Sequence, residues 1–250
     1  MRTFCLLFLV LCSCLSAQKT GPADLDAASV TLSADRTQYD LGEPISLNVN
    51  IENHTSKPIE TIGYSEYKVR VTYYMAYEGK PFEEIYYGGG GAIDSRQQRL
   101  RLGAGEVWQD QATLLREQGS PNSPGCPNCR AYLFDKAGYY HIKAVISEIN
   151  TPLNRENEPP HRVESNPIAI RILEPEGSDR VIWQQIRNDS EVAVFLESGE
   201  WPIGWPGYLG EPSVKTAKLE KLLERNPGSR FERRIRPVLI RWKETHAEAK

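Results

Sequence analysis

Apolar and polar residues alternate along much of the chain before residue 174. The clearest runs carry an apolar residue at every second position and are residues 45–51, 69–77, 140–146 and 168–172. A spacing of two places alternate side chains on one face of a β-strand. Because no helical pattern separates the runs, the sequence predicts a mainly β fold over residues 29–174, with two antiparallel sheets packed as a sandwich. Shorter candidate strands are residues 30–34, 82–87 and 106–115.

The spacing of apolar residues changes to that of helices after residue 174. Residues 175–250 are therefore predicted to form a C-terminal helical extension packed on the sandwich, since no helix in it is apolar all round. Residues expected at the starts of its helices are Ser178, Asp189, Ser213 and Ser229. Val181 and Val214 are expected to face inward, and Gly199 to end the second helix.

The last predicted helix has the most distinctive pattern. Ser229 and Glu232 form a capping box, in which each side chain accepts a hydrogen bond from a backbone N–H at the start of the helix. Its apolar stripe is Phe231, Ile235, Val238, Leu239 and Trp242. Pro237 interrupts this pattern and is expected to kink or restart the helix.

The first residues have the pattern of an export signal. Residues 4–15 form an apolar run after Arg2, which is shorter than the roughly 20 residues that a transmembrane helix needs. We therefore expect residues 1–17 to be a signal peptide cleaved after Ala17, residues 18–28 to be a linker, and the protein to be periplasmic or extracellular. Alternatively, residues 11–14 act as a lipobox, which would leave a lipidated Cys14 as a membrane anchor.

Charge excludes some partners. The 250 residues carry 30 Lys and Arg against 33 Asp and Glu, a net charge of −3, which is not that of a uniformly basic nucleic-acid-binding protein. Residues 215–250 hold 11 basic and 5 acidic side chains, whereas residues 18–214 hold 18 and 28. We expect the two parts to attract each other. The alternative is a basic patch for nucleic acid or anionic lipid, formed by Arg230, Arg233, Arg234, Arg236 and Arg241.

Two cysteines remain after removal of the predicted signal peptide. Cys126 and Cys129 follow a turn-forming segment rich in Gly, Ser, Pro and Asn. Two thiols in an oxidising compartment usually pair, so we expect a small disulfide that stiffens a loop. Redox chemistry is the alternative, since the spacing also suits a reactive dithiol.

Two segments carry a resemblance to known families. Residues 37–59 contain Tyr-Asp-Leu-Gly-Glu-Pro, an alternating strand and Asn-His-Thr-Ser-Lys-Pro-Ile, which resembles the opening of immunoglobulin-like sandwiches in exported bacterial proteins. Residues 135–144 are similar to the corner before the penultimate strand of such domains, where a tyrosine hydroxyl bonds back to the backbone. Tyr140, which shares its phase with Ile142 and Ala144, is favoured over Tyr139 for that role. The resemblance implies a fold and no activity.

The first of these segments is also distantly similar to the bacterial intracellular proteinase inhibitor family. The similarity covers its strand-turn-strand signature. That family is cytoplasmic, whereas residues 1–17 predict export, and no reactive-site residue can be transferred.

Motifs for catalysis or cofactors are missing from the sequence. It has no Gly-x-Ser-x-Gly, no His-Glu-x-x-His and no phosphate-binding Gly-Lys-Ser loop. We therefore expect no catalytic residues, no metal and no cofactor. Aromatic residues beside Gly and Pro are the candidate ligand contacts, namely Trp201, Trp205, Tyr208, Tyr86 and Tyr87. The alternative for these rings is to fill the seam between sandwich and helices.

These patterns together predict a non-catalytic, exported binding module of the bacterial cell envelope, with a protein or glycan as ligand and no nucleic acid. One alternative is a proteinase inhibitor that uses residues 119–130, held by the disulfide. The other is an envelope hydrolase that uses carboxylates such as Glu156 and Glu158.

Overall fold

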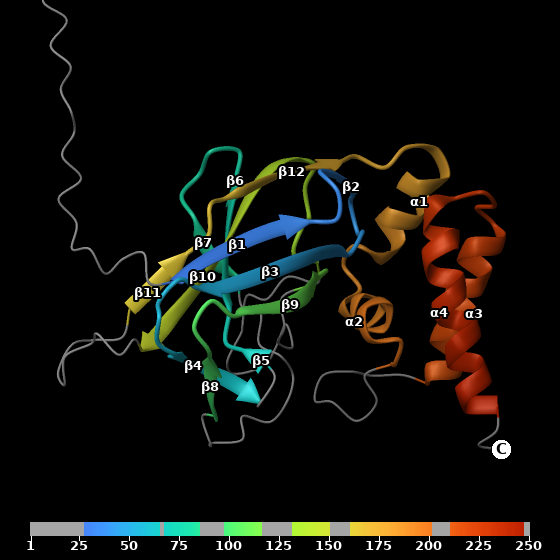
Figure 1. Ribbon diagram of the computed structural model, residues 1–250. Coiled ribbons are helices and arrows are strands. Elements are labelled where there is room, and N and C mark those ends of the chain that lie inside the picture. The colour runs from blue at the N-terminus through green and yellow to red at the C-terminus, as the bar shows by residue number, and fades with distance from the viewer. Residues whose placement is uncertain are drawn as a thin grey trace, which may run out of the picture.

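A computed structural model describes residues 28–65, 68–85, 98–116, 132–150, 161–201 and 211–247. Within these ranges the chain forms twelve strands followed by four helices, so the protein is mainly β with a helical C-terminal part. The four helices lie together at one end of the strands (Figure 1). None of the described helices is long and apolar enough to cross a membrane.

The smaller sheet has three antiparallel strands. They are β1 (Ala28–Ala34), β3 (Ile45–Asn53) and β9 (Val107–Leu114), in the order β1-β3-β9. β3 lies in the centre and alternates cleanly, with Ile45, Leu47, Val49 and Ile51 buried. The period-two pattern predicted this strand correctly.

The larger sheet is built around β10 (Gly138–Asn150), which pairs with β4, β6, β11 and β12. Its other strands are β2 (Gln38–Asp40), β4 (Ile59–Ser65), β5 (Lys68–Val69), β6 (Thr72–Tyr77), β7 (Glu83–Ile85), β8 (Gln98–Leu102), β11 (His161–Glu164) and β12 (Ile168–Leu173). All described pairs are antiparallel except β2–β12, which is parallel. The predicted antiparallel arrangement is therefore confirmed for every described pair except this one.

A single core joins the two sheets. Tyr140, Ile142, Ala144 and Ile146 of β10 belong to the same cluster of buried side chains as the inward residues of β3. The Tyr140 hydroxyl donates a hydrogen bond to the carbonyl of Lys136 at 2.9 Å. The predicted return of a tyrosine hydroxyl to the backbone is thus confirmed, and Tyr140 is the residue that makes it.

The helices are α1 (Gly177–Ile186), α2 (Ser190–Ser198), α3 (Pro212–Glu224) and α4 (Arg230–Ala247). Asp189 caps α2 by accepting hydrogen bonds from two backbone N–H groups, and Gly199 ends it with a φ of 80°, as predicted. Ser178 and Ser213 are not caps, because α1 and α3 begin one residue before each of them.

Two side chains predicted to face inward are exposed. Val181 is 45% exposed and Val214 is 65% exposed. The helix faces that pack instead contain a polar residue each, Asp179 in α1 and Thr216 in α3. Apolar periodicity placed Ile182, Ile186, Leu219 and Leu223 inward correctly but missed Asp179 and Thr216, because a buried polar residue with a hydrogen-bond partner does not register in that pattern.

The start of α4 is capped by a neighbouring helix. Ser229 Oγ accepts from the backbone N–H of Phe231 and donates to Asp179 Oδ1 in α1 at 2.6 Å. Asp179 Oδ1 also accepts from the backbone N–H of Arg230 at 2.8 Å. Glu232 accepts from Gly228 N–H, so only part of the predicted capping box forms. α4 continues through Pro237 as one helix.

Ion pairs fasten α4 to the last residue of β2 and the turn that follows it (residues 40–44, here the β2–β3 turn). Arg230 Nη1 lies 2.8 Å from Asp40 Oδ2, and Arg234 Nη2 lies 2.9 Å from Glu43 Oε2. Both carboxylates belong to buried residues. The attraction expected between the acidic and basic parts of the chain is present here, and it engages two arginines of the alternative basic patch.

Candidate binding surface

Trp201 does not lie on the surface. Its side chain is only 4% exposed, and its ring stacks on Phe195 with centroids 4.2 Å apart. Its indole N–H donates to Thr216 Oγ1 at 3.1 Å. The ring fills space between α2 and α3, so the prediction of Trp201 as a ligand contact is corrected to a role in packing.

The other predicted site residues lie outside the described part of the chain. They are the aromatic residues Trp205, Tyr208, Tyr86 and Tyr87, the cysteines Cys126 and Cys129, and the alternative lipidation site Cys14. The inhibitor segment at residues 119–130 and the carboxylates Glu156 and Glu158 lie outside it as well. These expectations remain predictions.

The described residues nevertheless contain a chemically distinctive surface, on the outer face of the larger sheet. Successive residues of β10 point to opposite faces. Tyr140 and Ile142 enter the core, so Tyr139, His141 and Lys143 lie on the opposite face. The register then sets their neighbours, because residues directly opposite each other share one side of a sheet.

One end of this face carries a tyrosine and an arginine. Tyr139 of β10 pairs in register with Arg171 of β12. The guanidinium carbon of Arg171 lies 5.6 Å from the centroid of the Tyr139 ring, which is cation–π geometry. Tyr139 is 52% exposed. Arg171 makes no ion pair with any described residue, so its N–H groups are available to a ligand.

A second cluster lies farther along the same face. Lys143 pairs in register with Tyr74 of β6. Its Nζ is 5.5 Å from the centroid of the Tyr74 ring and 5.0 Å from that of Phe82. The guanidinium carbon of Arg162 in β11 lies 5.6 Å from the centroid of the Tyr74 ring. Aromatic rings and cations thus recur in the same combination as at Tyr139.

Glu164 fixes the two cations of the second cluster. Its carboxylate accepts from Lys143 at 2.6 Å and lies 2.7 Å from Arg162 Nη2. The hydrogen bond from Lys143 holds the pKa of Glu164 below its ordinary value, and it outweighs the opposite effect of burial. The cations are therefore held near the rings while part of their positive charge is compensated.

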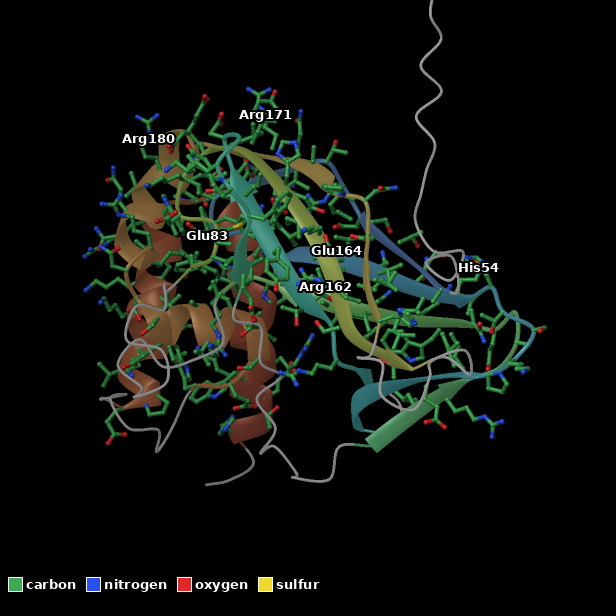
Figure 2. All side chains as sticks on the ribbon, turned by 90° about the vertical axis from the view of Figure 1, so that its left-hand side faces the viewer. His54, Glu83, Arg162, Glu164, Arg171 and Arg180 are labelled. Atoms are coloured by element: carbon green, nitrogen blue, oxygen red, sulfur yellow. The ribbon has the colours of Figure 1, made fainter. Side chains whose placement is uncertain are left out.

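Small side chains separate the two clusters. His141 has Ala169 and Ala76 as its register partners on either side. Alternate residues of a strand are about 6.6–6.8 Å apart. Tyr139 and Lys143 are two such steps apart along β10, so the two clusters are separated by about 13 Å. Figure 2 shows Arg171 toward one end of the sheet, with Arg162 and Glu164 farther along. We call this surface, formed by Tyr74, Phe82, Tyr139, Lys143, Arg162 and Arg171, the aromatic–basic face.

The chemistry of the aromatic–basic face suits binding. Ring faces stack on flat apolar surfaces, and Arg and Lys donate several hydrogen bonds each. Among the described residues, no group of three or more His, Cys, Asp or Glu side chains is placed to hold a metal ion. The sequence does not reveal this surface, because five of its residues come from four different strands and Phe82 comes from the segment before β7. The only available signal was the phase of Tyr139, which places it away from the core.

Comparisons with known proteins identify no family. No protein-family model and no curated protein matches the chain. Similar solved structures include a β-glucosidase from Erythrobacter marinus, with 15% identity over 58% of this chain and 15% of that chain and a TM-score of 0.32. An alkylpurine DNA glycosylase from Pseudomonas fluorescens has 12% identity over 58% of this chain and 30% of that chain, with a TM-score of 0.32.

A CARDB domain from Pyrococcus furiosus is also similar, with 11% identity over 58% of this chain and 87% of that domain and a TM-score of 0.29. The chain spans less than a third of the β-glucosidase and of the DNA glycosylase. At such low identities and TM-scores, the activities of these proteins say nothing about this chain.

Proposed function

We propose that the protein is a non-catalytic binding module of the bacterial cell envelope, built on an immunoglobulin-like sandwich, and that it binds a glycan through the aromatic–basic face. The observation that carries this proposal is the repeated combination of ring and cation on one side of the sheet, at Tyr139 with Arg171 and at Tyr74 with Lys143. Two such clusters about 13 Å apart offer two stacking positions along an extended ligand.

A glycan fits this surface better than an apolar peptide does. Sugar rings present flat C–H faces to aromatic rings and hydroxyl groups at their edges to charged side chains. Arg171, Lys143 and Arg162 supply the donors, and Glu164 supplies an acceptor. The predicted export signal in residues 1–17 supports a location where glycans are abundant.

Binding of the purified full chain to polysaccharides tests the proposal. The probes are polygalacturonate, mannan and isolated peptidoglycan, and isothermal titration or co-sedimentation provides the readout. We expect saturable binding to at least one probe, and about a tenfold loss of affinity for Tyr139→Ala and for Tyr74→Ala, since one aromatic contact contributes about 0.5–1.5 kcal/mol beyond its area. Lys218→Ala, on the exposed side of α3, is the matched surface control.

The opposite results are also informative. Unchanged affinity in both tyrosine variants would remove the aromatic–basic face from the proposal. Failure of all three glycans, together with specific capture of an envelope protein that both tyrosine variants lose, would replace the glycan with a protein ligand.

A further inference from the structure

A second feature lies between the two sheets, away from the aromatic–basic face. It is a cavity of about 180 Å³ at the end of the sheets where β8 and β9 approach each other. Within the described strands, β8 pairs only with β4 and β9 only with β3, so each is an edge strand of its sheet. The cavity therefore lies beside an unpaired edge of both sheets.

The wall of the cavity is apolar and its rim is exposed. Ile51, Ile59 and Ile146 are buried in the wall, and Leu100, Leu102 and Trp108 contribute partly buried surfaces. Arg101, Glu106 and Val107 are exposed residues of the same lining. A ligand can thus reach the cavity from solvent between the two edge strands.

One polar group in the wall lacks a hydrogen bond. Thr61 lines the cavity and is only 8% exposed, and its hydroxyl has no hydrogen-bond partner. A buried hydroxyl without a partner is costly, and such groups in native proteins usually find one. The hydroxyl and methyl groups of threonine exchange places through staggered rotamers, so a rotation about one bond can turn the hydroxyl toward an occupant.

We propose that this cavity binds one hydroxylated aromatic ring of the size of phenol. The volume agrees, because an apolar cavity of about 150 Å³ accepts benzene. The Trp108 indole in the wall favours a ring over an alkyl chain through aromatic contact. The ring hydroxyl supplies the hydrogen-bond partner that Thr61 lacks. This ring occurs both in free phenols and in tyrosine side chains of peptides.

Ligand titrations of the full chain test the cavity. Thermal unfolding is followed with increasing phenol and with toluene, which has nearly the same shape but no hydroxyl. A ligand that binds only the folded state raises Tm with its concentration. We expect phenol to bind about 5–10 times more tightly than toluene, because the gain is one neutral hydrogen bond to a buried group. Comparable binding of N-acetyl-tyrosinamide would identify a peptide side chain as the source of the ring, and its absence a free phenol.

Two variants separate the parts of the proposal. Thr61→Val keeps the shape of the side chain and is expected to remove the preference for phenol while toluene still binds. Leu100→Phe fills the cavity from the edge strand and is expected to abolish binding of both probes. Equal affinity of the original protein for phenol and toluene, or no saturable effect of either, would overturn the proposal. Neither substituted residue belongs to the aromatic–basic face, so glycan binding is tested independently.

Discussion

The indole of Trp183 in α1 lies directly against Gly42 in the β2–β3 turn. A Cβ atom on residue 42 would lie 2.7 Å from Cζ3 of Trp183, closer than such atoms approach in proteins. Phe231 of α4 stacks on the same indole, with centroids 6.5 Å apart, and its ring also approaches Gly42. Gly42 also has a φ of 74°, which favours glycine. This contact joins the helices to the sheets at a place where a larger residue does not fit.

Gly42→Ala is therefore expected to be much more destabilising than Gly79→Ala. The two glycines have φ values of 74° and 73°, but a Cβ on Gly79 would meet nothing within 4 Å. Gly79→Ala should cost about 1–2 kcal/mol through backbone strain alone. Gly42→Ala should cost about 1–3 kcal/mol more through overpacking against Trp183. Urea unfolding measures both, and equal costs would mean that Trp183 moves aside freely.

Acid is expected to weaken the junction between α1 and α4. Burial acts to raise the pKa of Asp179, but hydrogen bonds from Ser229 and Arg230 outweigh it and hold that pKa below its ordinary value of 3.8. The stabilisation is present above pH 3.8 and is lost as the pH falls through the lower folded-state pKa.

Asp179→Asn replaces the titrating carboxylate with an amide, so the pH dependence of its stability can be compared with that of the original protein. We expect it to lower the free energy of unfolding by about 2 kcal/mol at neutral pH, since it weakens hydrogen bonds to a charged acceptor. Below about pH 4, the loss of stability on acidification should then be smaller in the variant than in the original protein. Parallel curves from chemical denaturation at each pH would contradict the assignment.

Tyr140 and Tyr139 allow the loss of a buried hydroxyl to be compared with the loss of an exposed one at the start of β10. Tyr140→Phe removes the hydrogen bond to the carbonyl of Lys136 from a nearly inaccessible side chain and should cost about 1 kcal/mol. Tyr139→Phe alters an exposed ring on the preceding residue and should change stability by less than about 0.5 kcal/mol. Thermal or urea unfolding distinguishes them, and a larger cost for Tyr139→Phe would reverse their roles.

Substitution of Trp201 is expected to change stability rather than ligand affinity. Trp201→Ala removes the stacking on Phe195 and should cost about 3–5 kcal/mol. Thr216→Val, which keeps the ring and removes only its hydrogen-bond acceptor, should cost about 1 kcal/mol. A folded Trp201→Ala variant with unchanged stability and lost glycan binding would restore Trp201 as a ligand contact.

Period-two alternation predicted the strands in which apolar residues recur at every second position and missed several others. β3 and β10 each bury alternate residues over many positions, so the pattern is unambiguous. β2 has only three residues and owes its place to a parallel pairing with β12, which requires knowledge of the tertiary arrangement. β4, β8 and β11 were missed as well, because they carry too few apolar residues at alternate positions.

The candidate surface depended on information that no single stretch of sequence contains. Tyr139 and Arg171 come together through the register of β10 with β12, and Tyr74 reaches Lys143 through the register of β6 with β10. Trp201 showed the opposite problem, since its Pro- and Gly-rich surroundings are typical of an exposed loop while Phe195 and Thr216 enclose the ring. Local composition predicted the loop, and tertiary packing decided the position of the ring.

The pairing of Asp40 with Arg230 spans 190 residues of sequence and has a consequence for biosynthesis. Chains emerge from the ribosome N-terminus first, and domains generally fold as they emerge. Asp40 must wait for Arg230 and Arg234 before its carboxylate is compensated, whereas Glu43 is also paired with the nearby Arg36. A nascent chain can therefore assemble its strands early, but it closes this corner only after α4 has been synthesised. Synthesis interrupted before α4 would leave the Asp40 carboxylate without its two arginine partners.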